Sequence, residues 1–165
     1  MKKCWIFVVL AIFLTGCGAQ QTFETVSDDH VQSVAVMMQQ MQLELPENAS
    51  VMTLSNKETG TLYLCDGYTV TTQTIEAGDL ERTLMSSTGF TSQGLQLLQT
   101  DAGEIDRYEC VWVAAGETGS QVCRGCILDD GNYHYVVTII GDSADAGKLN
   151  DQWQRIMQSV KLTSE

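Results

Sequence analysis

Two Asp-Gly pairs, at 66–67 and 130–131, constrain the fold of this chain more than any other feature. A two-residue turn between antiparallel strands needs positive φ angles, which Asp and Gly adopt more readily than other residues. Each pair stands between segments with the residue alternation of strands: 60–65 and 68–75, then 120–129 and 132–141. We therefore predict two β-hairpins, the first with Cys65 opposite Tyr68.

Further segments extend the predicted sheet. Residues 104–115 precede 120–129 across a Gly-containing turn, so three consecutive strands form a meander. The last of them, 132–141, is apolar on both faces toward its end, which is typical of a central strand covered on both sides. Alternation also favours strands at 95–100 and 39–45, although helical spacing fits part of the latter stretch and leaves a preceding helix open.

Two helices are expected. Residues 79–88 have an apolar face, with Asp79 as the N-cap and Gly89 at the end. In the C-terminal helix, which Asp142 or Ser143 is expected to cap, apolar residues recur every three or four positions. They form one stripe: Leu149, Trp153, Ile156 and Val160. We expect this helix to fold back over the meander and to bury Trp153.

The N-terminal residues have the composition of a secretory signal. Lys2 and Lys3 precede an apolar run at 5–14, about half the ~20 residues that a membrane-spanning helix needs. The string Leu14-Thr15-Gly16-Cys17 follows. It resembles the lipobox of bacterial lipoproteins, at which the signal is removed and the cysteine is lipidated.

This resemblance divides the chain into three parts. Residues 1–16 are the signal peptide, 17–38 are the lipidated cysteine and a polar tether, and 39–165 form one α+β domain. Acyl chains on Cys17, palmitate among them, would hold the protein on the extracytoplasmic face of the cell membrane, since two chains bind firmly where one is marginal. Cleavage of an ordinary signal peptide near Gly18 is the alternative.

The charge of the chain excludes one class of partner. It carries 21 Asp and Glu against 9 Lys and Arg, for a formal net charge of −12 at pH 7. Contacts to nucleic-acid phosphates need clustered Lys and Arg, so no nucleic-acid partner is expected. Anionic lipid headgroups would also repel the protein. The membrane is therefore a partner through the lipid anchor and not through surface charge.

Several short strings point to a known fold. They are Leu43-Glu44-Leu45-Pro46, Arg107-Tyr108-Glu109-Cys110-Val111-Trp112 and the terminal Trp153 to Ser159-Val160 helix. With the order of the elements, they resemble small bacterial lipoproteins with a PsbP-like domain. The resemblance implies an antiparallel sheet of about six strands with helices on both faces, an α/β/α sandwich. It supplies no functional residue, because PsbP-like domains serve different roles.

Four cysteines would remain unmodified after export: Cys65, Cys110, Cys123 and Cys126. An even number in an exported chain makes disulfides candidates, with Cys65–Cys110 the favoured pair, and buried free thiols are the alternative. Cys123 and Cys126 form a CxxC string. It lies in a predicted strand, where residues i and i+3 point to opposite faces, so a redox pair there is disfavoured. A zinc site that Cys65 and Cys110 would complete is disfavoured because a second CxxC string is missing.

Other candidate chemistry is sparse. His30 lies near the tether, and His134 lies on a strand, where a lone histidine is most often structural or solvated. The acidic turn 129–132 lacks the twelve-residue calcium loop, and we interpret it as a hairpin turn. A second acidic cluster has three members: Asp101, Glu104 and Asp106. Strand aromatics (Tyr63, Tyr68, Tyr108, Trp112, Tyr133 and Tyr135) are expected in the core, with a ligand groove as the alternative.

The sequence therefore predicts a membrane-anchored lipoprotein of the cell envelope that acts as a non-enzymatic accessory or binding module for an envelope protein. No catalytic residue, resident metal or cofactor is expected. The alternative is a lipoprotein that handles a small ligand or a metal ion through its cysteines or acidic turns.

Overall fold

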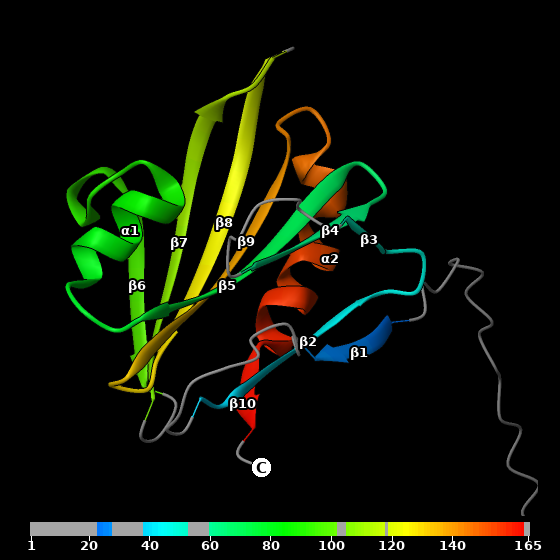
Figure 1. Ribbon diagram of the computed structural model, residues 1–165. Coiled ribbons are helices and arrows are strands. Elements are labelled where there is room, and N and C mark those ends of the chain that lie inside the picture. The colour runs from blue at the N-terminus through cyan, green and yellow to red at the C-terminus, as the bar shows by residue number, and fades with distance from the viewer. Residues whose placement is uncertain (1–22, 28–37, 53–59, 102–104, 118, 164–165) are drawn as a thin grey trace, which may run out of the picture.

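Seven antiparallel strands form the main sheet of this protein, seen in a computed structural model that describes residues 23–27, 38–52, 60–101, 105–117 and 119–163 (Figure 1). In spatial order they are β3 (Ser50–Met52), β4 (Gly60–Cys65), β5 (Tyr68–Glu76), β9 (Tyr133–Asp142), β8 (Ser120–Asp129), β7 (Asp106–Ala115) and β6 (Gln96–Asp101). No helix in these residues is long and apolar enough to cross a membrane.

A second, three-stranded sheet has the order β1 (Phe23–Ser27), β2 (Gln40–Pro46) and β10 (Lys161–Thr163). The expected antiparallel sheet of about six strands corresponds to the seven-stranded main sheet, and among the described residues this second sheet adds three strands. β1 lies within the predicted tether, 17–38, and pairs with β2 over five residues, so that expectation is wrong for this segment. The helix that was left open before residue 39 falls almost wholly outside the described residues.

Both predicted hairpins form, but the second turn is longer than the predicted two residues, because Asp129 pairs with His134 and residues 130–133 connect them. Cys65 faces Tyr68 across the first turn, where Gly67 has a φ of +82°. In the second turn Gly131 has a φ of +85°. An L side chain is strained at these angles, whereas glycine adopts them freely. β8 and β9 then pair along their lengths, and β9 lies between β5 and β8 as expected for a central strand.

Helix α1 (Leu80–Thr88) has both predicted caps. The side chain of Asp79 accepts a hydrogen bond from the Glu81 backbone N–H at 3.1 Å, which satisfies a donor that the helix leaves unpaired. At the other end Gly89, with a φ of +78°, donates its N–H to the Met85 carbonyl at 3.0 Å. A 3-10 turn, η1 (Ser92–Gly94), connects α1 to β6.

Helix α2 (Ala146–Ser159) begins later than predicted. Its N-cap is Asp145, and the prediction of Asp142 or Ser143 is wrong. Asp142 belongs to β9, and its carboxylate accepts from the Ala144 N–H at 2.8 Å in the turn before the helix. Because the Asp142 carboxylate is bonded within this turn, it does not cap the helix.

The two helices cover opposite faces of the main sheet, as the α/β/α arrangement requires. One buried cluster includes Trp153 and Ile156 of α2 together with residues of β2, β5 and β9. The other includes Leu84 of α1 together with Trp112 and Val136. Side chains alternate between the faces of a strand, so β9 contributes to both clusters. The predicted strand aromatics are in or against these clusters, which confirms their placement in the core.

Trp153 is the central contact between α2 and the sheet. It is fully buried, as predicted, and its ring lies against Gly141 of β9. A Cβ atom at Gly141 would stand 2.6 Å from the Trp153 ring, so only glycine leaves room for the indole. Tyr68 meets the same ring edge-on at 5.9 Å between centroids.

Gly141→Ala is expected to destabilise the fold by about 1–3 kcal/mol, because the new methyl group forces the indole out of its position. Gly147→Ala is the matched control, since no atom lies within 4 Å of the corresponding Cβ position and alanine favours the helix. Chemical denaturation followed by tryptophan fluorescence measures both. Equal stability of the two variants would contradict this packing.

Candidate binding groove

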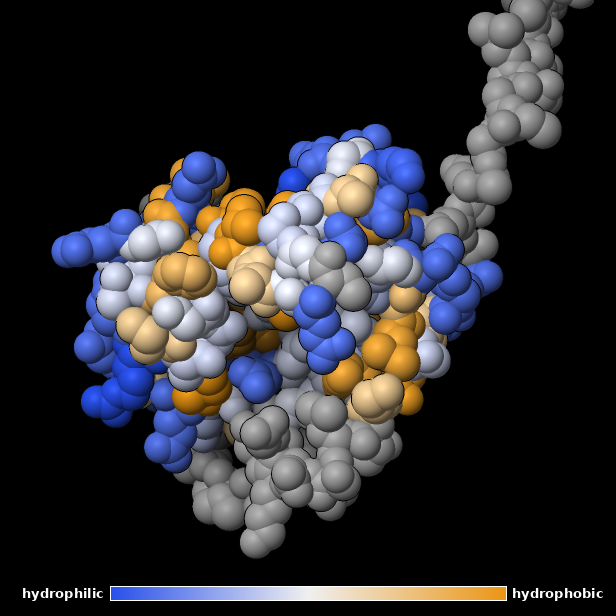
Figure 2. All heavy atoms as spheres, turned by 90° about the horizontal axis from the view of Figure 1, so that it is seen from above, coloured by the Kyte–Doolittle hydropathy of each residue, from blue (hydrophilic) through white to orange (hydrophobic). Residues whose placement is uncertain are grey.

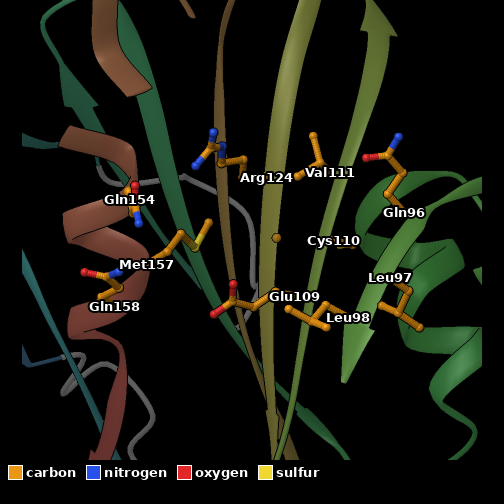
Figure 3. A pocket seen from close by; sticks show the side chains of 11 residues that line it. Gln96, Leu97, Leu98, Glu109, Cys110, Val111, Arg124, Gln154, Met157 and Gln158 are labelled. Atoms are coloured by element: carbon orange, nitrogen blue, oxygen red, sulfur yellow. The ribbon is translucent and has the colours of Figure 1, made fainter. Parts of the chain in front are cut away.

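A groove lies between α2 and the β6–β7 edge of the main sheet (Figure 3). Its volume is about 410 Å³, within the range of small-ligand sites. Four elements line it, with β6, β7 and β8 forming the floor and α2 forming one wall. The lining residues are Gln96, Leu97, Leu98, Glu109, Cys110, Val111, Arg124, Gly125, Gln154, Met157 and Gln158.

The floor is exposed because α2 covers only part of its face of the sheet. Cys110 and Trp112 of β7 are buried under α1, so the alternating residues Val111 and Val113 point to the α2 side. There Val111 is 39% exposed, Val113 is 60% exposed and Leu98 of β6 is 59% exposed. Figure 2 shows hydrophobic residues at the molecular surface among hydrophilic ones. Large apolar side chains gathered in this way mark contact surfaces.

Arg107 fixes one end of the groove. Its Nη1 donates to the Val160 carbonyl at 3.0 Å, and its Nη2 donates to the Met157 carbonyl. These carbonyls close the C-terminal turn of α2, where a cation is favourable. Its Nε also donates to Glu109 at 2.7 Å. Arg107 therefore ties β7 to the end of α2 and neutralises the carboxylate in the groove.

Arg124 of β8 contacts α2 nearer to its N-terminal end. Its Nη2 donates to the Asn150 side chain at 2.7 Å, and its guanidinium carbon lies 5.9 Å from the centroid of the Trp153 ring. A guanidinium over an indole face is attracted by the electrons of the ring. Both arginines that border the groove are thus engaged with α2, and they leave an apolar floor with amide side chains at its rim.

The cysteines lie on both faces of the sheet. Cys126 and Cys65 belong to the cluster beneath α2, whereas Cys110 and Cys123 belong to the cluster beneath α1. All four are free thiols, so the favoured pair Cys65–Cys110 is not formed in this structure. Cys123 and Cys126 point to opposite faces of β8, as predicted. The four thiols cannot share one zinc ion, and the described residues hold no group of three metal-binding side chains.

Burial makes these thiols unreactive. It raises the pKa of Cys110 to about 11 and that of Cys126 to about 12, and it also raises the pKa of Cys65 and Cys123. The thiolate is the form that attacks electrophiles and binds metals. At neutral pH the four groups are therefore protonated and pack as small apolar side chains.

His134 lies in a polar arrangement that the sequence did not disclose. Its Nδ1 is 2.7 Å from the Thr83 hydroxyl, and its Nε2 is 3.3 Å from an Asp129 carboxylate oxygen, without the angle of a hydrogen bond. The order of hydroxyl, imidazole and carboxylate resembles that of a hydrolase site. However, His134 is 0% exposed and Thr83 is 4% exposed, so no substrate reaches them. The contact joins α1 to β9. His30 lies outside the described residues.

The acidic turn is a hairpin turn, as interpreted from the sequence. Asp129 accepts from the Gly131 N–H at 2.8 Å, and Asp130 accepts from the Asn132 and Tyr133 N–H groups. These bonds occupy the oxygens that a calcium ion would use. In the second acidic cluster, Asp106 is exposed at the start of β7, while the side chains of Asp101 and Glu104 lie outside the description.

Alkylation tests the placement of the thiols. Because their pKa values are raised, the thiols of the folded protein should react more slowly with iodoacetamide at pH 7 than those of the denatured chain, and Cys110 and Cys126 should still react slowly at pH 9, where both remain mostly protonated. After denaturation without a reductant, Cys65, Cys110, Cys123 and Cys126 should all be modified, as peptide mass spectrometry measures. Protection of any pair until a reductant is added would show a disulfide.

Sequence comparison identifies no relative. No protein-family model matches the chain, and no curated protein matches it.

Structural comparison does find similar proteins, all of low sequence identity. The cyanobacterial PsbP protein CyanoP of Synechocystis has a TM-score of 0.60 and 9% identity over 91% of this chain and 99% of its own. LpqN of Mycobacterium tuberculosis, described as involved in cell envelope biogenesis, has a TM-score of 0.51 and 12% identity over 86% and 92%. A Bacteroides thetaiotaomicron protein has a TM-score of 0.52 and 10% identity over 76% of this chain, which spans 46% of that longer one.

These similarities lie below the identity at which function can be carried over, and they concern the backbone arrangement. They agree with the antiparallel sheet, its two covering layers and the order of its elements, which the sequence strings had already indicated. The chain contains a PsbP-like α+β domain.

Proposed function

We propose that this protein is a lipid-anchored, non-enzymatic binding module on the extracytoplasmic face of a bacterial cell membrane, and that it contacts an envelope protein through the groove beside α2. The observation that carries the proposal is the exposed apolar floor formed by Leu98 and Val111, which Val113 extends on the same face of β7 beyond the groove. Removing large apolar side chains from water is favourable, so a partner protein that covers these residues would be stabilised in the complex.

The N-terminal sequence supports the anchor. Leu14 to Cys17 follows a short apolar run and two lysines, in the order that lipoprotein export requires. The acidic composition supplies no attraction to anionic lipids, so acyl chains are the means of attachment that the sequence offers. LpqN, a protein of similar fold, is described as acting in cell envelope biogenesis, which is consistent with this setting.

The state of the polar groups supports a non-enzymatic role. The imidazole of His134 and the hydroxyl of Thr83 are enclosed between α1 and β9. The thiols have raised pKa values, which disfavours nucleophilic chemistry. In the groove, Glu109 is paired with Arg107, and Arg124 is bonded to Asn150. The described lining therefore offers apolar contact and amide hydrogen bonds.

Substitution of the lipidated residue tests the anchor. Cys17→Ser should move the protein from the membrane fraction to the soluble fraction, because no acyl chain can be attached, and intact-mass measurement should show the lipid lost. The wild-type chain is the control, and its mature N-terminus should be residue 17. A wild-type protein that begins elsewhere, or is released when cells are broken, would refute the anchor.

Photocrosslinking in intact cells tests the groove. A photoreactive amino acid at Leu98 should give a discrete protein adduct, and the adduct should disappear when Val111→Glu places a charge on the apolar floor. Val51 on β3 is the matched control position, since it is 58% exposed against 59% for Leu98 and lies at the opposite edge of the sheet. Equal adducts from both positions would contradict the proposal.

A second candidate function is the binding of a small apolar ligand, which the volume of the groove and its mixed lining favour. This candidate would be favoured by two results together: no protein adduct at Leu98, and a ligand that raises the melting temperature of wild type but not of Val111→Glu.

A further inference from the structure

Strand β1 places the point of attachment on one side of the folded body. β1 is an edge strand of the small sheet, and it pairs with β2 from Phe23 to Ser27. Arg155 of α2 reinforces this pairing, because its guanidinium carbon lies 3.9 Å from the centroid of the Phe23 ring. Arg155 also contacts the Glu44 carboxylate of β2 at 3.2 Å. The chain is therefore fixed to the body from Phe23 onward.

The covalent distance from the anchor to this point is short. Six peptide units join Cys17 to Phe23, and a fully extended chain spans at most ~3.3–3.6 Å per residue. Whatever path residues 17–22 take, Phe23 stays within roughly 20 Å of the lipidated cysteine. A domain of this size is roughly 35–40 Å across, so the tether is shorter than the body it holds.

The groove lies away from this attachment point. In Figure 1, β1 and β6 are on opposite sides of the molecule, with α2 and the main sheet between them. The groove is formed on the β6–β7 side. The α2 wall of the groove adjoins β1, since Gln158 lines both the groove and a smaller pocket with Thr25. A tether that holds β1 close to the bilayer therefore places α2 between the bilayer and the β6–β7 floor of the groove.

We infer that the short link from Cys17 to β1 orients the domain, with the β1 side of the small sheet facing the lipid headgroups and the groove facing away from the membrane. This inference rests on the proposed anchor at Cys17. It deepens the proposed function, because it makes the groove accessible to a partner that approaches from outside the bilayer. Tether length, and not attraction of an acidic body to lipid, sets the orientation.

Quenching by membrane nitroxides tests the orientation. The full lipidated protein is reconstituted in phosphatidylcholine vesicles that contain a headgroup-nitroxide lipid, with a fluorophore on Thr25→Cys or on Gln99→Cys. Both positions are exposed and lie on edge strands, β1 and β6. The probe at residue 25 should be quenched at least about twofold more than the probe at residue 99, given the ~20 Å limit. Unsubstituted protein, treated with the same fluorophore, is the control for labelling of the four native thiols.

A longer tether is the matched control. Insertion of about 20 Gly and Ser residues after Gly18 gives a flexible link whose average span is ~25 Å and whose reach exceeds the body, so the difference between the two probes should disappear. Equal quenching with the native tether would overturn the inference, as would a difference that survives the insertion. Protein that fails to sediment with the vesicles would instead refute the anchor itself.

Discussion

The packing of α2 on β9 is the contact on which the rest of the structure depends. Trp153 fills the space that Gly141 leaves open, and the buried stripe of the helix follows from that fixed point. Once α2 is placed, its C-terminal turn lies within reach of Arg107, and Arg155 lies within reach of Phe23. The groove wall and the position of the first strand are therefore both consequences of one tight approach between a ring and a backbone.

The charged side chains near the groove act mainly on the structure. Arg107 bonds two helix carbonyls and the Glu109 carboxylate, while Arg124 bonds Asn150 and lies over Trp153. Hydrogen bonds of this kind to a charged group contribute more than neutral ones. Because Arg107, Glu109 and the Nη2 of Arg124 are bonded within the protein, the contact proposed for the groove relies on shape and apolar surface.

Features set by neighbouring residues could be predicted from the sequence. The two Asp-Gly hairpins and both caps of α1 depend on φ angles and hydrogen bonds within a few positions, so the local residues determine them. The short strands β1, β3 and β10 could not be predicted. Each has three to five residues, and a partner distant in sequence decides whether such a segment pairs.

The candidate site was less predictable than the fold. Val111 and Val113 share a face of β7 because side chains alternate along a strand, but the sequence does not show how far α2 extends across that face. The same limit applies to the contact of His134 with Thr83, which are 51 positions apart and meet only after α1 packs on β9. The expectation of no nucleic-acid partner, in contrast, needs only the charge count and no structure, and it stays a prediction.

The exposed residues of the groove floor contribute little to the buried clusters. Leu98 in the groove and Val113 beside it are more than half exposed, and neither belongs to the cores beneath the two helices. Substitutions at such positions usually change stability by less than about 0.5 kcal/mol. Substitutions on this surface can therefore change its binding properties while the fold stays stable. Related proteins could acquire new partners in this way without a change of fold.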